Sequence, residues 1–135
     1  MIEVLLADDD ALMRALIAEW LSEAGYRVRQ AAGGEEALGM LRSGPARLLI
    51  TDMDMPGLDG GQTLGEATRM WPSLAVIAIS GGTQGSRQGR SGRTWVANAL
   101  KLGASKALAK PFERHELLRA IEDVLRKKPT DAAHT

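Results

Sequence analysis

The sequence predicts an α/β fold in which five parallel strands form a doubly wound sheet between helices. Two observations carry this prediction: short strand-like runs, and the segments of helical periodicity that separate them. Three runs are continuously apolar and each is followed directly by a polar residue, which is typical of parallel strands covered on both faces. They comprise residues 4–7, 48–50 and 74–79. Two more, 26–31 and 106–110, alternate in polarity or carry charges at both ends, and they suit sheet edges.

A segment with helical periodicity follows each predicted strand. This alternation favours a parallel sheet, because parallel neighbours need a crossover helix. The first helix should end at Gly25, where a left-handed residue is favoured. The second spans 35–42, the third ends before Pro72, and the fourth closes at Gly103. The first and fifth helices are predicted to bury apolar faces. These faces consist of Leu12, Leu16, Ile17, Trp20, Leu21 and Ala24 in the first, and of Leu117, Leu118, Ile121, Val124 and Leu125 in the fifth.

The chain of 135 residues suits one compact domain, which we expect at residues 1–127, followed by a polar tail at 128–135. Lys and Arg number 17, as do Asp and Glu, so no net charge draws the chain to nucleic acid or an anionic membrane. The longest apolar run, 74–79, is too short to span a membrane, and the N-terminus does not resemble a signal peptide. We therefore expect a cytoplasmic protein without membrane or direct nucleic-acid partners.

One segment, 81–93, carries five Gly and three Arg among Ser, Thr and Gln, and has no apolar residue with which to pack. We interpret it as a loop inserted within the domain. Two roles remain open from composition alone: a solvated loop, or a basic flap over the adjacent strand end.

Polar residues end four of the predicted strands. Asp8-Asp9-Asp10 follows the first strand, Asp52 the third, Ser80 the fourth and Lys110 the fifth. In an open parallel sheet these carboxyl ends form the edge at which ligands bind. Several carboxylates at one edge repel one another until a proton or a cation binds, and Mg²⁺ suits such oxygen ligands, with Mn²⁺ as a substitute. The sequence contains no Cys, which excludes thiolate metal sites and a Cys nucleophile.

The same residue types suit phosphoryl transfer. The carboxylate of Asp52 can act as a nucleophile toward phosphorus and form an aspartyl phosphate. A bound metal and Lys110 would neutralise the charge that develops, while the Ser80 hydroxyl would donate a hydrogen bond to a phosphoryl oxygen.

These motifs, in this order, resemble the receiver domains of two-component response regulators, and the resemblance covers about residues 3–126. The residues that carry it are Asp8-Asp9, the run from Asp52 to Gly60, Ser80, Gly103-Ala104 and Lys110-Pro111-Phe112. The resemblance implies a flavodoxin-like, CheY-like (βα)5 topology with strand order 2-1-3-4-5.

Carried over by position, the resemblance implies that Asp52 accepts a phosphoryl group from a sensor histidine kinase or a histidine phosphotransferase. Asp8, Asp9, Asp52 and the backbone carbonyl of Asp54 would bind Mg²⁺. Ser80 and Lys110 would contact the phosphoryl group. The Lys110-Pro111 bond would be cis, as X-Pro bonds can be, and Pro56 and Gly60 would shape the turn after the phosphoacceptor.

The family also implies a role in signalling. The chain would catalyse only its own phosphorylation and dephosphorylation, and would not act as an enzyme on other substrates. Phosphorylation would switch its conformation and its binding to an output protein that the sequence does not name, and could be linked to homodimer formation. No effector domain fits within 127–135, so we expect a single-domain regulator or a part of a larger one.

Three features depart from the family pattern. The position three residues before the lysine is usually aromatic, but is Ala107 here, so a rotating ring cannot report phosphorylation. The segment between Ser80 and Lys110 is longer than usual. Asp10 adds a third acid, which either raises metal affinity or caps the first helix.

A second class of function has some support in the residues. The segment 48–54 also looks like the strand-Asp-x-Asp opening of haloacid-dehalogenase-type phosphohydrolases, with Asp52 as nucleophile and Asp54 as acid/base. That interpretation leaves Asp8 and Asp9 without a role and has no room for a cap domain. A scaffold with a degenerate site is disfavoured, because no motif residue is missing.

Overall fold

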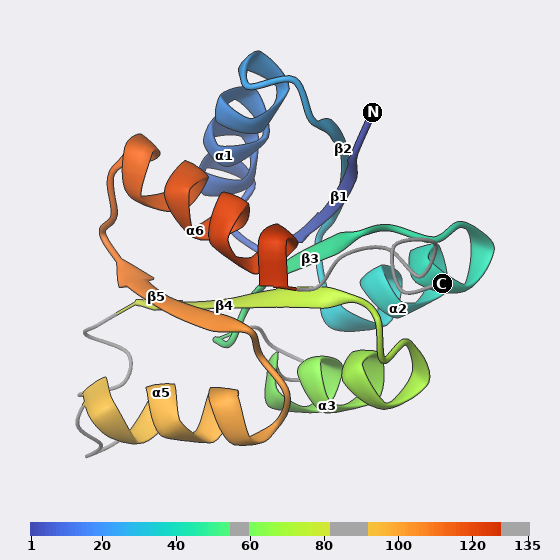
Figure 1. The fold of residues 1–135 in the computed structure, drawn as a ribbon, viewed down its shortest axis with the longest axis vertical. Coiled ribbons are helices and arrows are strands. Elements are labelled where there is room, and N and C mark those ends of the chain that lie inside the picture. The colour runs from blue at the N-terminus through green and yellow to red at the C-terminus, as the bar shows by residue number, and fades with distance from the viewer. Residues whose placement is uncertain (55–59, 82–91, 128–135) are drawn as a thin grey trace.

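The computed structural model describes residues 1–54, 60–81 and 92–127 (Figure 1). Its centre is a five-stranded sheet in which all neighbouring strands are parallel. The strand order is β2-β1-β3-β4-β5, which confirms the predicted doubly wound topology. The strands are β1 (Glu3–Ala7), β2 (Arg27–Ala31), β3 (Leu48–Asp52), β4 (Ala75–Gly81) and β5 (Lys106–Lys110).

Helices cover both faces of the sheet (Figure 1). Helices α1 and α6 lie on one face, and α2, α3 and α5 lie on the other. Their bounds are α1 (Ala11–Glu23), α2 (Gly34–Ser43), α3 (Gly60–Met70), α5 (Gly92–Lys101) and α6 (Arg114–Lys127). Within the described ranges, none of these helices is long and apolar enough to cross a membrane.

The core consists of two hydrophobic layers, one on each face of the sheet. Successive strand residues point to opposite faces, so Leu49 packs toward α2, α3 and α5 while Ile50 packs toward α1 and α6. Both side chains are fully buried. The central strands are therefore apolar up to their carboxyl ends for the reason that the sequence suggested: each is covered on both faces.

Local signals place several helix ends where the sequence predicted them. The Asp10 carboxylate accepts hydrogen bonds from the amides of Leu12 and Met13 and caps α1. Gly25, with φ of 98°, follows the end of that helix. Helix α3 ends at Met70, two residues before Pro72. Asp10 is thus a helix cap, one of the two roles left open for it.

The predicted buried face of α1 is partly wrong. Leu12 and Leu16 are 85% and 42% exposed, whereas Ile17, Ala18 and Leu21 form the buried stripe. At about 100° per residue, Leu12 lies on the opposite side of the helix from this stripe. It also belongs to the first turn, at the carboxyl edge of the sheet.

The ends of the predicted insertion 81–93 are also corrected. Gly81 is the last residue of β4, and Gly92 and Arg93 open α5. Residues 82–91 lie outside the described ranges, so the choice between a solvated loop and a flap stays a prediction. The same holds for the tail 128–135, which follows the end of α6.

Candidate functional site

The predicted site residues meet at the carboxyl edge of the sheet. Asp8 follows β1, Asp52 ends β3 and Lys110 ends β5, while Ser80 is the penultimate residue of β4. Parallel strands bring these ends to one edge, and the order reverses between β1 and β3, where Asp8 and Asp52 stand. Open α/β sheets bind ligands at this switch point.

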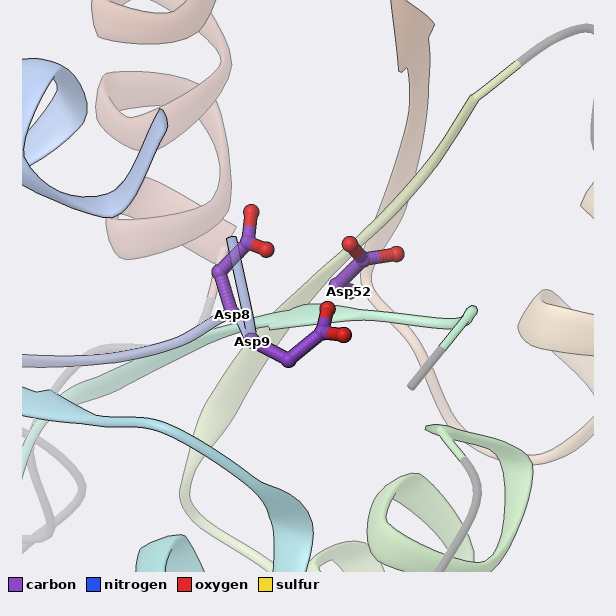
Figure 2. A group of neighbouring side chains, drawn as sticks. All are labelled: Asp8, Asp9 and Asp52. Carbon is purple, nitrogen blue, oxygen red and sulfur yellow. The ribbon is translucent and has the colours of Figure 1, made fainter. Parts of the chain in front are cut away.

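Three carboxylates form an acidic cluster (Figure 2). One oxygen of each of Asp8, Asp9 and Asp52 lies within 4.8 Å of the others. Asp8 and Asp52 are 1% and 4% exposed, whereas Asp9 is exposed to solvent. Two buried anions and one exposed anion make a donor set that fits a hard dication entering from solvent, because such ions prefer carboxylate oxygens and keep several waters. The donors give no support to zinc or copper, for which His or Cys is usual.

Lys110 neutralises part of this charge. Its Nζ lies 3.1 Å from Oδ2 of Asp52 and 3.3 Å from Oδ2 of Asp8. Burial alone lowers the pKa of Lys110, but the carboxylates of Asp52 and Asp8 outweigh it, so the pKa is raised and the ammonium stays charged. The lysine therefore holds the two acids together by a shared ion pair.

The surroundings of Asp52 raise the pKa of its carboxyl group. Its burial raises its pKa, and the negative charge of Asp8 adds to this effect. The amide of Asp54, which donates to Oδ1 at 2.9 Å, and the ammonium of Lys110 act in the opposite direction. Perturbed groups of this kind concentrate at functional sites.

The loop that carries Asp8 is held by Arg14, a residue that the sequence pattern does not predict to belong to the site. Arg14 donates from Nη1 to the carbonyl oxygen of Asp8 at 2.7 Å and from Nε to Oε1 of Gln30 at 3.3 Å. The Asp8 carboxylate also accepts from the amide of Asp10 at 2.9 Å. Arg14 lies one helical turn after the acids, and nothing in the sequence pattern distinguishes it from a solvated arginine.

Ser80 contacts a further acid of the site, Asp54. Its hydroxyl donates to Oδ2 of Asp54 at 2.7 Å, and Ser80 itself is 2% exposed. The sequence predicts a main-chain role at the metal for Asp54 in a receiver domain and an acid/base role in a phosphohydrolase, but no contact with Ser80. The Asp-x-Asp spacing was the available signal, because the second carboxylate follows the strand end closely.

The remaining predicted features fall as follows. The Lys110-Pro111 bond is cis, as the resemblance implied. Ala107 is half-buried and packs against the layer formed with α2, α3 and α5. Gly60 opens α3, while Pro56 lies outside the described residues.

The fold and the site together define a class: small doubly wound α/β domains with an acidic site at the switch point and a lysine across from it. A comparison with protein-family models then matches residues 4–122 to the response regulator receiver domain. The chain belongs to this family, as the sequence predicted.

Curated proteins and solved structures give the same result. The chain is 34% identical to the response regulator receiver protein CpdR of Brucella abortus, over 90% of this chain and 95% of that protein. It is 35% identical to a probable chemotaxis protein CheY of Rhizobium etli, over 91% and 92% of the two chains. The crystal structure of the receiver domain of NtrX from Brucella abortus superposes with a TM-score of 0.80 at 30% identity, covering 91% of this chain and 98% of that one.

The chain is therefore a receiver domain of the two-component response regulators, with a role in signalling. These matches do not support the phosphohydrolase alternative. The roles of individual residues, the identity of the metal and the cytoplasmic location stay predictions.

Proposed function

We propose that Asp52 accepts a phosphoryl group from a sensor histidine kinase or a histidine phosphotransferase, in a reaction that requires Mg²⁺. The observation that carries the proposal is the position of Lys110, whose Nζ contacts both Asp52 and Asp8 where β1, β3 and β5 end. A buried nucleophile next to a fixed cation is suited to the negative charge of a phosphoryl group.

The proposed metal ligands are the carboxylates of Asp8, Asp9 and Asp52 and the main-chain carbonyl of Asp54. The first three already converge within 4.8 Å. Bound Mg²⁺, or Mn²⁺ in its place, would supply positive charge that stabilises the phosphoryl oxygens during transfer.

The chain's own residues would carry the transfer as follows. An oxygen of Asp52 attacks phosphorus, the new O–P bond forms as the N–P bond to the donor histidine breaks, and the bonding electrons leave with the imidazole. Lys110 stabilises charge on the phosphoryl oxygens, and the Ser80 hydroxyl donates to one of them. Formation of the acyl phosphate needs no general base, because the Asp52 carboxylate attacks in its ionised form.

Phosphorylation would then change which surface binds an output protein, and it could favour a homodimer. Because Ala107 replaces the usual aromatic residue, the signal would leave through another element near Ser80. A population shift between two conformations is sufficient for this output. The chain would be a phosphoacceptor, with its own phosphorylation and dephosphorylation as its only reactions.

Acetyl phosphate with Mg²⁺ tests the proposal, because a small donor needs only the residues of this chain. Intact-mass measurement should show one base-labile phosphoryl group per chain in the wild type and none in Asp52→Asn. Asp123→Asn is the matched control: this acid lies on α6, pairs with Lys106 of β5, and its substitution should leave uptake unchanged.

Equal uptake by Asp52→Asn would contradict the assignment of the phosphoacceptor. Continuous release of phosphate over many equivalents of donor would instead favour a phosphohydrolase, because a receiver domain takes up about one group and loses it slowly.

A further inference from the structure

The contact between Ser80 and Asp54 links the end of β4 to the loop that follows the phosphoacceptor. The Ser80 hydroxyl, at the end of β4, donates to the Asp54 carboxylate in the loop after β3, at 2.7 Å. A hydroxyl that donates to a charged oxygen at this distance makes one of the stronger hydrogen bonds found in proteins. Its proton is directed at Asp54, whereas the proposed function needs it directed at a phosphoryl oxygen on Asp52.

We propose that the side chain of Asp54 is a latch that holds Ser80 in the unphosphorylated arrangement and sets how readily the domain switches. This inference rests on the proposed function of Asp52. Asp54 would be a positioning residue that acts through Ser80, in addition to any role of its main-chain carbonyl at the metal.

The chemistry of the hydroxyl makes the two arrangements exclusive. Ser has one O–H donor, so a full hydrogen bond to the phosphoryl group requires that the bond to Asp54 be given up. The exchange replaces one anionic acceptor by another, and its cost is the strength of the Asp54 contact. A stronger latch therefore means a smaller population of the switched conformation.

The position of Asp54 is itself coupled to the phosphoacceptor. The Asp54 amide donates to Oδ1 of Asp52 at 2.9 Å, while Lys110 contacts Oδ2. When Asp52 becomes an acyl phosphate, one carboxylate oxygen forms the O–P bond and the other becomes a neutral carbonyl oxygen, which is a weaker acceptor. Phosphorylation thus weakens one anchor of Asp54 and presents Ser80 with a competing acceptor.

Binding of beryllofluoride with Mg²⁺ measures this latch, because the complex mimics the phosphoryl group without turnover. Isothermal titration of the wild type and of Asp54→Ala should show about tenfold tighter binding in the variant, the effect expected from removing a charge-assisted bond that opposes the switch. Asp54→Asn should fall between the two, because it keeps an acceptor oxygen and loses the charge.

The same pair of measurements in a Ser80→Ala background separates a latch from simple repulsion. If Asp54 acts through Ser80, Asp54→Ala should have no effect when the hydroxyl is absent. Asp10→Asn is the charge-matched control: it removes one negative charge from the same edge of the sheet, while asparagine still caps α1. When the pair is measured in the Asp10→Asn background, the difference in affinity between Asp54→Ala and its parent should be the same as in the wild type.

An equal gain from Asp54→Ala in both backgrounds would overturn the latch, because direct charge repulsion would explain it. Beryllofluoride binding by Asp54→Ala, with Ser80 present, that is equal to or weaker than binding by the wild type would also overturn the latch. Phosphoryl uptake from acetyl phosphate, measured on the same samples, keeps the proposed function separate. Asp52-dependent uptake without coupling between Asp54 and Ser80 rejects the latch alone, whereas a wild type without uptake rejects the proposed function and the latch with it.

Discussion

At the amino edge of the sheet, where helices turn back into strands, polar groups are paired within the turns. Arg29 donates to the carbonyl oxygens of Met40 and Gly44, which end α2, and Thr68 donates to the carbonyl of Leu102 at 2.9 Å. At the carboxyl edge, by contrast, two carboxylates are buried beside each other and share one lysine.

This difference shows how one sheet separates stability from function. The contacts at the amino edge satisfy helix ends and tighten turns, so they stabilise the fold. The carboxylates at the other edge repel one another, and the protein retains them although a neutral site would be easier to bury. Substitutions at the two edges should therefore change stability in opposite directions.

The largest expected effect is at Gly103, in the turn that leads from α5 into β5. Gly103 has φ of 115°, and an added Cβ would lie 2.7 Å from Cγ2 of Thr68. Gly103→Ala should lower the free energy of unfolding by about 3 kcal/mol, because it combines backbone strain with a steric clash. Urea unfolding measures the loss, and uptake of phosphate from acetyl phosphate should be unchanged under conditions where the variant is folded.

Gly39→Ala is the matched control for this substitution. Gly39 lies within α2, and a Cβ there would meet nothing within 4 Å. The variant should gain about 0.5–1 kcal/mol, because alanine loses less backbone entropy in a helix. If Gly39→Ala lowers the free energy of unfolding as much as Gly103→Ala does, strain and steric clash in the turn at Gly103 cannot be the explanation.

The carboxyl edge should behave in the opposite way. Asp52→Asn should raise the stability of the metal-free protein at neutral pH by about 1 kcal/mol, because it removes a buried charge beside Asp8. Lys110 keeps Asp8 as a partner in this variant.

The effect of Asp52→Asn should depend on pH in a defined direction. Burial raises the pKa of Asp52 above its unfolded value of 3.8. The folded protein therefore binds a proton more tightly, and this contribution to stability is complete below the unfolded pKa and is lost as pH rises through the folded pKa. Thermal unfolding should show the variant's advantage at pH 7 shrinking as the pH falls toward 4. A constant advantage across this range would contradict the assignment to Asp52.

The sequence was sufficient for the fold because its signals are local and repeated. Apolar runs such as 48–50 are unambiguous when both faces of a strand are covered, and residues such as Asp10, Gly25 and Pro72 mark helix ends by their own chemistry. The convergence of Asp8, Asp52 and Lys110 also followed, because parallel topology alone brings strand ends to one edge.

The errors arose where the outcome depends on tertiary packing. Leu12 is apolar but belongs to the exposed side of α1, and only the packing of the helix on the sheet decides which side is buried. Gly92 is a poor helix former and stands in a run of Gly, Ser and Arg, yet it begins α5, which packs against the core through Ala99 and Val96. The contact between Ser80 and Asp54 depends on side-chain torsions: the Asp-x-Asp spacing places the second carboxylate near the strand end but does not determine its partner.

The most direct test of the opposition between the two edges is the melting temperature of the wild type and of Asp9→Ala, each with and without Mg²⁺. Without the ion, Asp9→Ala should melt slightly higher, because it removes repulsion within the acidic cluster, an effect below about 1 kcal/mol. With saturating Mg²⁺ the wild type should gain stability in proportion to its affinity, and the order should reverse because the variant lacks one ligand. An equal response to Mg²⁺ in both proteins, or none in the wild type, would contradict the account of the carboxyl edge as a metal site.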